Sequence, residues 1–233
     1  MRFTGERCIL GEVDKVLENR HLSRYKFALP YIENKKVLDI GCGTGYGTAL
    51  LAQLVDEIIG VDISKEAIDY AKKNYQKRNI KFYVGNAINL NFLKDRMFDV
   101  IVSFEVIEHI PNSDQYLKEV YRLLKPNGVF IVSTPNKRYS SPNSEKPLNP
   151  FHVTEFWLDD FKRLLKKYFS NVKLYGQDPQ IKLRNFVKKL LPQKLWRVIF
   201  PQAIKDVYNI RQASKFTNEN IGNCRFFLAI CEK

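Results

Sequence analysis

The fold is decided by the stretch Val37-Leu38-Asp39-Ile40-Gly41-Cys42-Gly43-Thr44-Gly45-Tyr46-Gly47. A short apolar run is followed by glycine at every second position, which is typical of a buried strand that leads into a tight turn. Glycine is needed where the backbone itself approaches a ligand or takes a positive φ. The residues at 48–54 predict a helix that begins at the same turn. This stretch therefore predicts a strand, turn and helix that bind a nucleotide-like ligand.

The spacing of these glycines narrows the class of ligand. A dinucleotide-binding turn has the pattern G-x-G-x-x-G, whereas this chain has G-x-G-x-G preceded by Asp39. An NAD(P)-dependent or nucleotide-sugar enzyme with a Rossmann fold would also need a proton relay such as Tyr-x-x-x-Lys, which we do not find. That class stays open as an alternative on the glycine turn alone.

Composition bounds the class of protein. The chain has 233 residues, of which 45% are hydrophobic, enough for one globular domain spanning 1–233. No apolar run resembles a signal peptide or a membrane span, and the four cysteines lack metal-finger spacing. We therefore expect a cytoplasmic protein with reduced thiols.

Positive charge is concentrated in the second half of the chain. The net charge is +13, and residues 136–223 contribute 17 basic against 7 acidic side chains. Such an excess indicates an anionic acceptor, an anionic membrane surface or nucleic acid, or is simply a solvated basic surface. Apolar stripes flanked by lysine and arginine in 183–210 favour a lid, and would also suit peripheral membrane contact. A non-catalytic ligand- or nucleic-acid-binding module is a further alternative.

Later strands also end in polar residues. The predicted strand 57–62 ends in Asp62, which lies 21 residues after Gly41. An acid at about this offset meets the ribose hydroxyls of a bound nucleotide. The next predicted strand, 80–84, is followed by Asn86, and the apolar strand at 98–104 leads into a polar loop. Because carboxyl ends of parallel strands share one edge, these residues are expected to lie together.

Two motifs carry a family resemblance. The glycine turn after Asp39, and the strand Phe98–Phe104 with its Glu-Val-Ile-Glu-His tail, resemble class I S-adenosylmethionine (SAM)-dependent methyltransferases, in particular a bacterial subgroup acting on small molecules, sugars or lipids. The resemblance implies an α/β, Rossmann-like, doubly wound and mostly parallel seven-stranded sheet with an antiparallel C-terminal strand. It also implies SAM as the cofactor.

The resemblance further implies a division of the chain. An N-terminal helical cap is expected at 1–30, the Rossmann-like core at 31–175 and 224–233, and a helical cap or lid insertion at 176–223. By analogy Arg7, Arg24 or Tyr25 reaches the methionyl carboxylate of the cofactor, and Asn86 stands where the family commonly has Asp. The predicted cofactor-binding residues are Arg24, Asp39, Gly41, Cys42, Gly43, Gly45, Asp62, Ile63, Asn86, Ala87, Phe104 and Glu105.

The predicted chemistry is methyl transfer to a small-molecule, sugar or lipid-linked acceptor, most readily at oxygen. His109 is the first candidate for a general base and His152 the second, since imidazole titrates near neutral pH. No metal is expected, because the H-E-x-x-H pattern needs two histidines four apart. The Asn/Asp-Pro-Pro-Tyr and Pro-Cys motifs of nucleobase methylation are absent after the fourth strand, which argues against nucleic acid as the acceptor. The sequence leaves the oligomeric state open.

Overall fold

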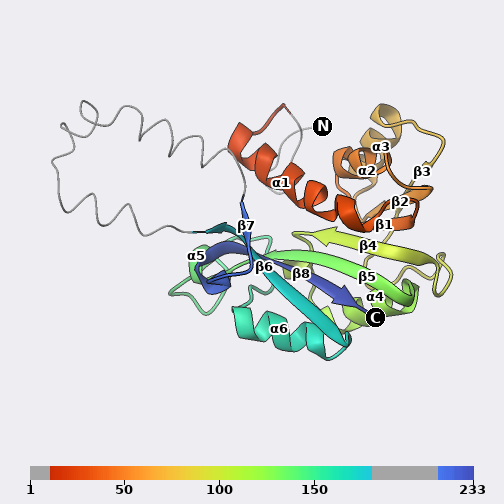
Figure 1. The fold of residues 1–233 in the computed structure, drawn as a ribbon. Coiled ribbons are helices and arrows are strands. Elements are labelled where there is room, and N and C mark those ends of the chain that lie inside the picture. Colours follow the sequence, from red (N-terminus) through yellow and green to blue (C-terminus); the bar gives the residue numbers. More distant parts are fainter. Residues whose placement is uncertain (1–10, 180–214) are drawn as a thin grey trace.

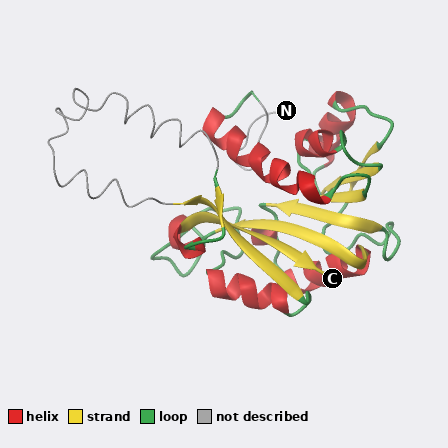
Figure 2. Cartoon of the chain, viewed as in Figure 1, coloured by secondary structure: helices red, strands yellow, loops and turns green. Residues whose placement is uncertain are grey.

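The computed structural model describes residues 11–179 and 215–233, which form one mixed sheet with helices on both faces (Figures 1 and 2). The strand order is β3-β2-β1-β4-β5-β8-β6-β7. The strands are β1 (Lys36–Ile40), β2 (Glu57–Asp62), β3 (Ile80–Val84), β4 (Phe98–Phe104), β5 (Leu124–Pro135), β6 (Asn171–Pro179), β7 (Phe216–Thr217) and β8 (Cys224–Glu232).

The pairing confirms the predicted fold class. Strands β1 to β5 pair in parallel, and β8 runs antiparallel between β5 and β6. The prediction of seven strands was one too few. The two-residue strand β7 pairs with β6 as an eighth member, and two residues are too short to show a period-two pattern.

Helices cover both faces of the sheet, as Figure 1 shows. One apolar cluster packs α4 (Ser113–Leu123) and α6 (Leu158–Lys166) against side chains such as Leu38 and Ile101. A second packs α1 (Lys15–Ala28) and α2 (Tyr46–Leu51) against Val37 and Val100. Neighbouring strand residues thus point to opposite faces, as a doubly wound sheet requires. The helices are α1 (Lys15–Ala28), α2 (Tyr46–Leu51), α3 (Lys65–Asn74), α4 (Ser113–Leu123), α5 (Lys137–Ser140) and α6 (Leu158–Lys166), with short 3-10 turns η1 (Leu29–Tyr31), η2 (Ile107–His109) and η3 (Ile221–Asn223).

Local signals explain where the helices begin. The Asp14 carboxylate accepts from two backbone amides of the first turn of α1, and the Ser64 hydroxyl accepts from Ala67 N at 3.3 Å at the start of α3. Residues 134–150 include four prolines, yet they are partly regular, since β5 extends to Pro135 and α5 follows.

The predicted insertion at 176–223 differs at both described ends. Residues 176–179 continue β6, where Gln177 pairs with Phe226 of β8, and Phe216–Thr217 forms β7. Residues 180–214, including the apolar stripes and the expected membrane contact at 183–210, lie outside the described residues. No helix within 11–179 or 215–233 is long and apolar enough to cross a membrane.

Candidate active site at the carboxyl ends of the strands

The glycine turn lies directly after β1. Gly41, Gly43 and Gly45 have φ of +74°, +53° and +84°, values that side-chain-bearing residues rarely adopt. A Cβ placed on Gly43 would meet no heavy atom of the described residues within 4 Å. The turn therefore leaves open space beside its backbone, and only a residue without a side chain keeps that space available to a ligand.

Asp62 joins the end of β2 to this turn. Its Oδ2 accepts from Gly43 N at 2.9 Å and its Oδ1 from Ser64 N at 2.8 Å. A carboxylate offers about four lone-pair sites, so each oxygen retains capacity for another donor. Two hydroxyl groups of a ribose can be held in this way. Ile63, the next residue, is 69% exposed and offers an apolar surface at the same edge.

Asn86 follows β3 at the neighbouring position. Gly85 N donates to Asp62 O at 3.0 Å, which ties the two strand ends together. The Asn86 amide oxygen accepts from Ile88 N at 3.2 Å, and Asn86 itself is exposed, whereas Ala87 packs against the core. The turn, Asp62, Ile63 and Asn86 are therefore brought to one edge, as the sequence predicts.

Asp39 and Cys42 lie beneath the turn instead of at its surface. Asp39 is fully buried; it accepts from Thr48 Oγ1 at 2.6 Å, and Tyr25 OH lies 3.4 Å from each carboxylate oxygen. Burial raises the pKa of Asp39 to about 7, although these hydroxyl groups oppose the shift. Burial also raises the pKa of the Cys42 thiol well above its usual range. Both side chains support the turn from within.

The loop after β4 begins with Phe104 and Glu105. Phe104 packs edge-on against Tyr25, with ring centroids 5.0 Å apart. Glu105 has a φ of +57°. Its Oε1 accepts from Ser133 Oγ at 2.7 Å, and its Oε2 lies 3.3 Å from Arg24 Nη2. Glu105 is thus held between α1 and β5.

Arg24 is fully buried, although the sequence places it in a cap helix. Its Nε donates to Gln177 Oε1 at 2.8 Å, and its guanidinium lies over the Phe226 ring at 4.5 Å. Among the described residues its Nη1 has no hydrogen-bond partner. Sequence reasoning missed Gln177 and Phe226, because they meet α1 only through strands far along the chain.

Glu108, His109 and His152 come together at the same loop. Val153 N and Thr154 N both donate to Glu108 O, at 2.8 and 3.0 Å, and this holds the later segment against η2. The rings of His109 and His152 meet edge to face with centroids 5.0 Å apart. Burial and the charge of Glu105 raise the pKa of Glu108 well above its usual range. The two candidate bases are therefore neighbours.

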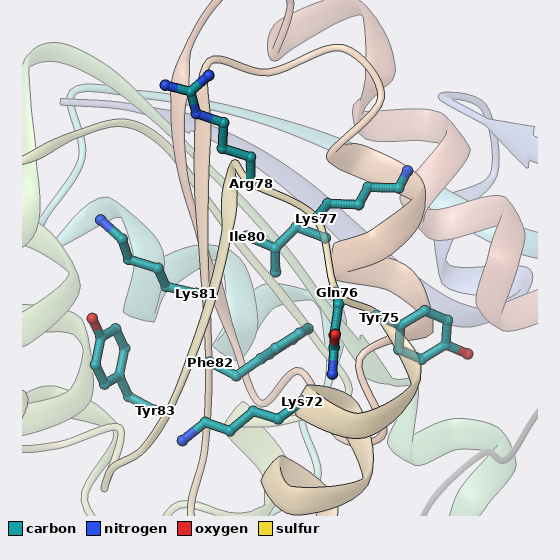
Figure 3. Close-up of a pocket in the computed structure, with 9 residues that line it drawn as sticks. All are labelled: Lys72, Tyr75, Gln76, Lys77, Arg78, Ile80, Lys81, Phe82 and Tyr83. Atoms are coloured by element: carbon teal, nitrogen blue, oxygen red, sulfur yellow. The ribbon is translucent and has the colours of Figure 1, made fainter.

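A hollow of about 590 Å³ lies elsewhere, between the end of α3 and the start of β3 (Figure 3). It is lined by basic and aromatic side chains, including Lys72, Lys77, Arg78 and Phe82. Its lining follows β3 from Ile80 to Tyr83 and stops before Asn86, which comes after the carboxyl end of that strand. None of the predicted site residues lines it.

Comparison with known proteins places the chain in a family. A family model described as a methyltransferase domain matches residues 32–190, more than half of the chain. A Mycolicibacterium smegmatis protein named a probable S-adenosylmethionine-dependent methyltransferase is 37% identical over 165 residues, covering 70% of this chain and 63% of that protein. The chain thus spans less than two thirds of that relative's length.

Two further relatives are O-methyltransferases by name. A ubiquinone biosynthesis O-methyltransferase from Pelagibacter ubique is 38% identical over 47% of this chain and 46% of its own. A fatty-acid O-methyltransferase from M. smegmatis is 31% identical over 56% and 51%. Among solved structures, a SAM-dependent methyltransferase from Thermotoga maritima superposes with a TM-score of 0.66 over 94% of this chain and 91% of its own; at 22% identity it supports the fold alone.

The chain belongs to the SAM-dependent methyltransferase family, whose cofactor is SAM. This replaces the NAD(P)-dependent enzyme that the glycine turn alone left open. Both features fit an adenosyl group. The open space at Gly43 admits the ligand, and the spare lone pairs of Asp62 can accept hydrogen bonds from the two ribose hydroxyl groups.

Proposed function

We propose that this protein transfers a methyl group from SAM to an oxygen atom of a small-molecule, sugar or lipid-linked acceptor. The observation that carries the proposal is the meeting, at one sheet edge, of the glycine turn with Asp62 and the polar loop with His109 and His152. The two relatives named as O-methyltransferases, one for ubiquinone biosynthesis and one for fatty acids, support oxygen as the methylated atom and a lipid-related acceptor.

The cofactor would be held mainly by backbone and by one carboxylate. Asp62 accepts hydrogen bonds from the ribose hydroxyl groups. Ile63 lies against the adenine ring, and Asn86 accepts a hydrogen bond from the adenine amino group. Arg24 Nη1, buried and unpartnered within the described chain, offers a donor for the methionyl carboxylate. The sulfonium of bound SAM makes its methyl group electrophilic, so the chain itself must supply orientation and proton removal.

Methylation of a hydroxyl oxygen also requires loss of its proton. His109 and His152 are the side chains proposed for this step, since a neutral imidazole accepts a proton near pH 7. Arg24 and Ser133 hold Glu105 beside this loop, where it can orient the acceptor. The 17 basic residues at 136–223 favour an acceptor that carries negative charge.

Calorimetry with SAM tests the cofactor assignment. We expect the wild type to bind SAM and Asp62→Ala to bind about 100-fold more weakly, since two hydrogen bonds to a charged acceptor are lost. Asp69→Ala is the control, because that side chain lies on the surface of α3, where it pairs with Lys65. Absence of binding by the wild type, or undiminished binding by Asp62→Ala, contradicts the proposal.

The acceptor needs a separate measurement. The protein is incubated with methyl-labelled SAM and a cell extract, and the labelled products are identified by mass spectrometry. We expect label on an oxygen of a small or lipid-linked molecule. Label on nitrogen, carbon or a nucleobase would overturn that part of the proposal, whereas the SAM titration tests the cofactor independently.

A further inference from the structure

Three potential metal ligands meet beside the loop after β4. Glu108, His109 and His152 each present one ligand atom, and these atoms lie within 4.8 Å of one another. Two of them belong to η2, and His152 comes from a segment that the backbone bonds to Glu108 O hold in place. The sequence pattern missed this set because its two histidines are 43 positions apart, far beyond the four-residue spacing of a helical metal motif.

The histidines are held in the tautomer that suits a metal. Nδ1 of His109 lies 2.8 Å from Phe151 O, and Nδ1 of His152 lies 2.7 Å from Glu155 Oε1. Both partners are acceptors, so each Nδ1 carries a proton, and in the neutral imidazole the lone pair is then on Nε2. A carbonyl or carboxylate that accepts from the distal nitrogen is the usual support of a metal-bound histidine.

The environment of His152 agrees with this assignment. Its Nε2 lies 3.0 Å from Asn149 Nδ2, and an amide nitrogen can only donate. Nε2 therefore acts as an acceptor here, which is the state required of a ligand. Asn149 lies on the same loop, and a metal ion would take the place of its amide hydrogen at this nitrogen.

Glu108 supplies an independent observation. Its side chain is fully buried, Oε2 accepts from Thr134 Oγ1 at 3.1 Å, and Oε1 has no hydrogen-bond partner among the described residues. A buried carboxylate oxygen without a partner is costly and rare in folded proteins. A bound cation beside the two imidazoles would supply the missing partner.

We propose that Glu108, His109 and His152 together bind one divalent cation of the first transition series, such as Zn²⁺ or Mn²⁺. Two imidazoles and one carboxylate form the ligand set of catalytic zinc and non-haem iron sites, and imidazole disfavours Ca²⁺ and Mg²⁺. Three protein ligands leave at least one coordination position open. Metal binding itself does not depend on the proposed methyl transfer.

The use of that open position rests on the proposed function. An acceptor hydroxyl bound there would lose its proton to water more readily, because the cation stabilises the resulting alkoxide. The alkoxide oxygen then forms the new C–O bond, while the methyl–sulfur bond breaks and its electron pair stays on sulfur. With the cation bound, His109 and His152 would be its ligands and water would take the proton, so the role of proton acceptor proposed for them above applies to the protein without the cation.

Titration of the chelator-treated, untagged protein with ZnCl₂ or MnCl₂ alone, without SAM or acceptor, tests the inference. We expect one cation per chain for the wild type and affinity at least about 100-fold weaker for Glu108→Gln and His152→Ala. Glu155→Gln should retain one site and weaken it by about 10- to 100-fold, since it removes only the support of His152. Glu145→Gln, an exposed change on the same loop, is the control.

Two measurements keep the result decisive if a variant folds poorly. Thermal unfolding of each variant reports folding, and Co²⁺ added to the wild type should give the visible absorption of nitrogen- and oxygen-bound cobalt. Absence of this spectrum together with absence of a one-to-one site, or equal affinity in folded Glu108→Gln, overturns the inference. That outcome does not affect SAM binding by protein that retains Asp62, so the SAM titration tests the proposed function separately.

Discussion

The two sides of the candidate site differ in how their polar groups are satisfied. On the turn side (Gly41–Gly45, Asp62, Ile63 and Asn86), both oxygens of Asp62 accept backbone hydrogen bonds. On the loop side (Phe104–His109 and His152), an oxygen of buried Glu108 has no partner among the described residues. Since unpaired buried groups are costly, the turn side is complete as a scaffold, whereas the loop side is organised for a group that it must bind.

Asp39, beneath the turn, gives the largest expected effect. Its folded pKa is about 7 against an ordinary value of 3.8, so between these pH values the folded protein holds a proton that the unfolded chain releases. Rising pH therefore destabilises the fold, by about 1.4 kcal/mol per pH unit from this group or about 4 kcal/mol over the window. Asp39→Asn should remove this contribution.

Urea unfolding at several pH values between 4 and 8 measures the contribution. The free energy of unfolding of the wild type should decline relative to that of Asp39→Asn as pH rises. Asp56→Asn, a change at an exposed position, should keep the wild-type slope. Parallel profiles for wild type and Asp39→Asn would show that the Asp39 carboxyl group titrates normally, and this would contradict its raised pKa.

Gly47 gives the next largest effect, because it allows α1 to pack on α2. A Cβ on Gly47 would lie 1.9 Å from Tyr25 Cζ, so the ring must move. Gly47→Ala should lower the free energy of unfolding by about 3 kcal/mol. In Gly222→Ala, Leu158 at 3.9 Å is the one described residue within 4 Å of the new Cβ, and stability should change by less than about 1 kcal/mol. Equal stability of the two variants would contradict this account of the contact.

Most of the turn side was predictable, because neighbouring residues determine it. The glycine spacing, the strand at 57–62 and the terminal Asp62 are local patterns, and the predicted strands at 57–62, 80–84 and 98–104 match β2 to β4. The fold class followed from the same alternation of strands and helices. A motif read along the chain is sufficient when the residues that build a site lie within one strand–turn–helix unit.

The loop side could not be predicted from local sequence patterns. Arg24 contacts Gln177, which is 153 positions away. His152, which follows β5 and α5 in the chain, contacts His109 before β5. A helical insertion was predicted to begin at Gly176, yet pairing with β8 continues the strand to Pro179. Tertiary pairing overrides local propensity at these positions, and no spacing along the sequence records it.

Thr134 tests the loop side itself. Thr134→Val removes the hydroxyl that donates to buried Glu108, and should cost about 2 kcal/mol of unfolding free energy. Ser133→Ala removes the corresponding donor to Glu105, which is partly exposed and still pairs with Arg24, and should cost about 1 kcal/mol or less. Urea unfolding of both variants measures the difference. A larger loss in Ser133→Ala would indicate that Glu105 is the less well-supported carboxylate.

The smallest expected effect comes from alanine at Gly43 on the turn side. It distinguishes the loss of space for a ligand from the cost of backbone strain. Gly43 and Gly11 both have positive φ, +53° and +84°, and within 11–179 and 215–233 no heavy atom would lie within 4 Å of a Cβ on either. Alanine at either position should therefore cost a similar 1–2 kcal/mol in backbone strain, which urea unfolding measures. Only at Gly43 would the methyl group occupy the space proposed for SAM.

Calorimetry with SAM should accordingly find affinity about tenfold weaker, or about 1.4 kcal/mol, for Gly43→Ala and unchanged for Gly11→Ala. Equal affinities would mean that Gly43 is needed for its φ alone and that the open space beside it lies outside the cofactor. A loss of SAM affinity confined to Gly43→Ala would mean that the cofactor binds in the space that the missing side chain of Gly43 leaves open. The turn side would then form the site by its backbone, since its own hydrogen bonds are already complete.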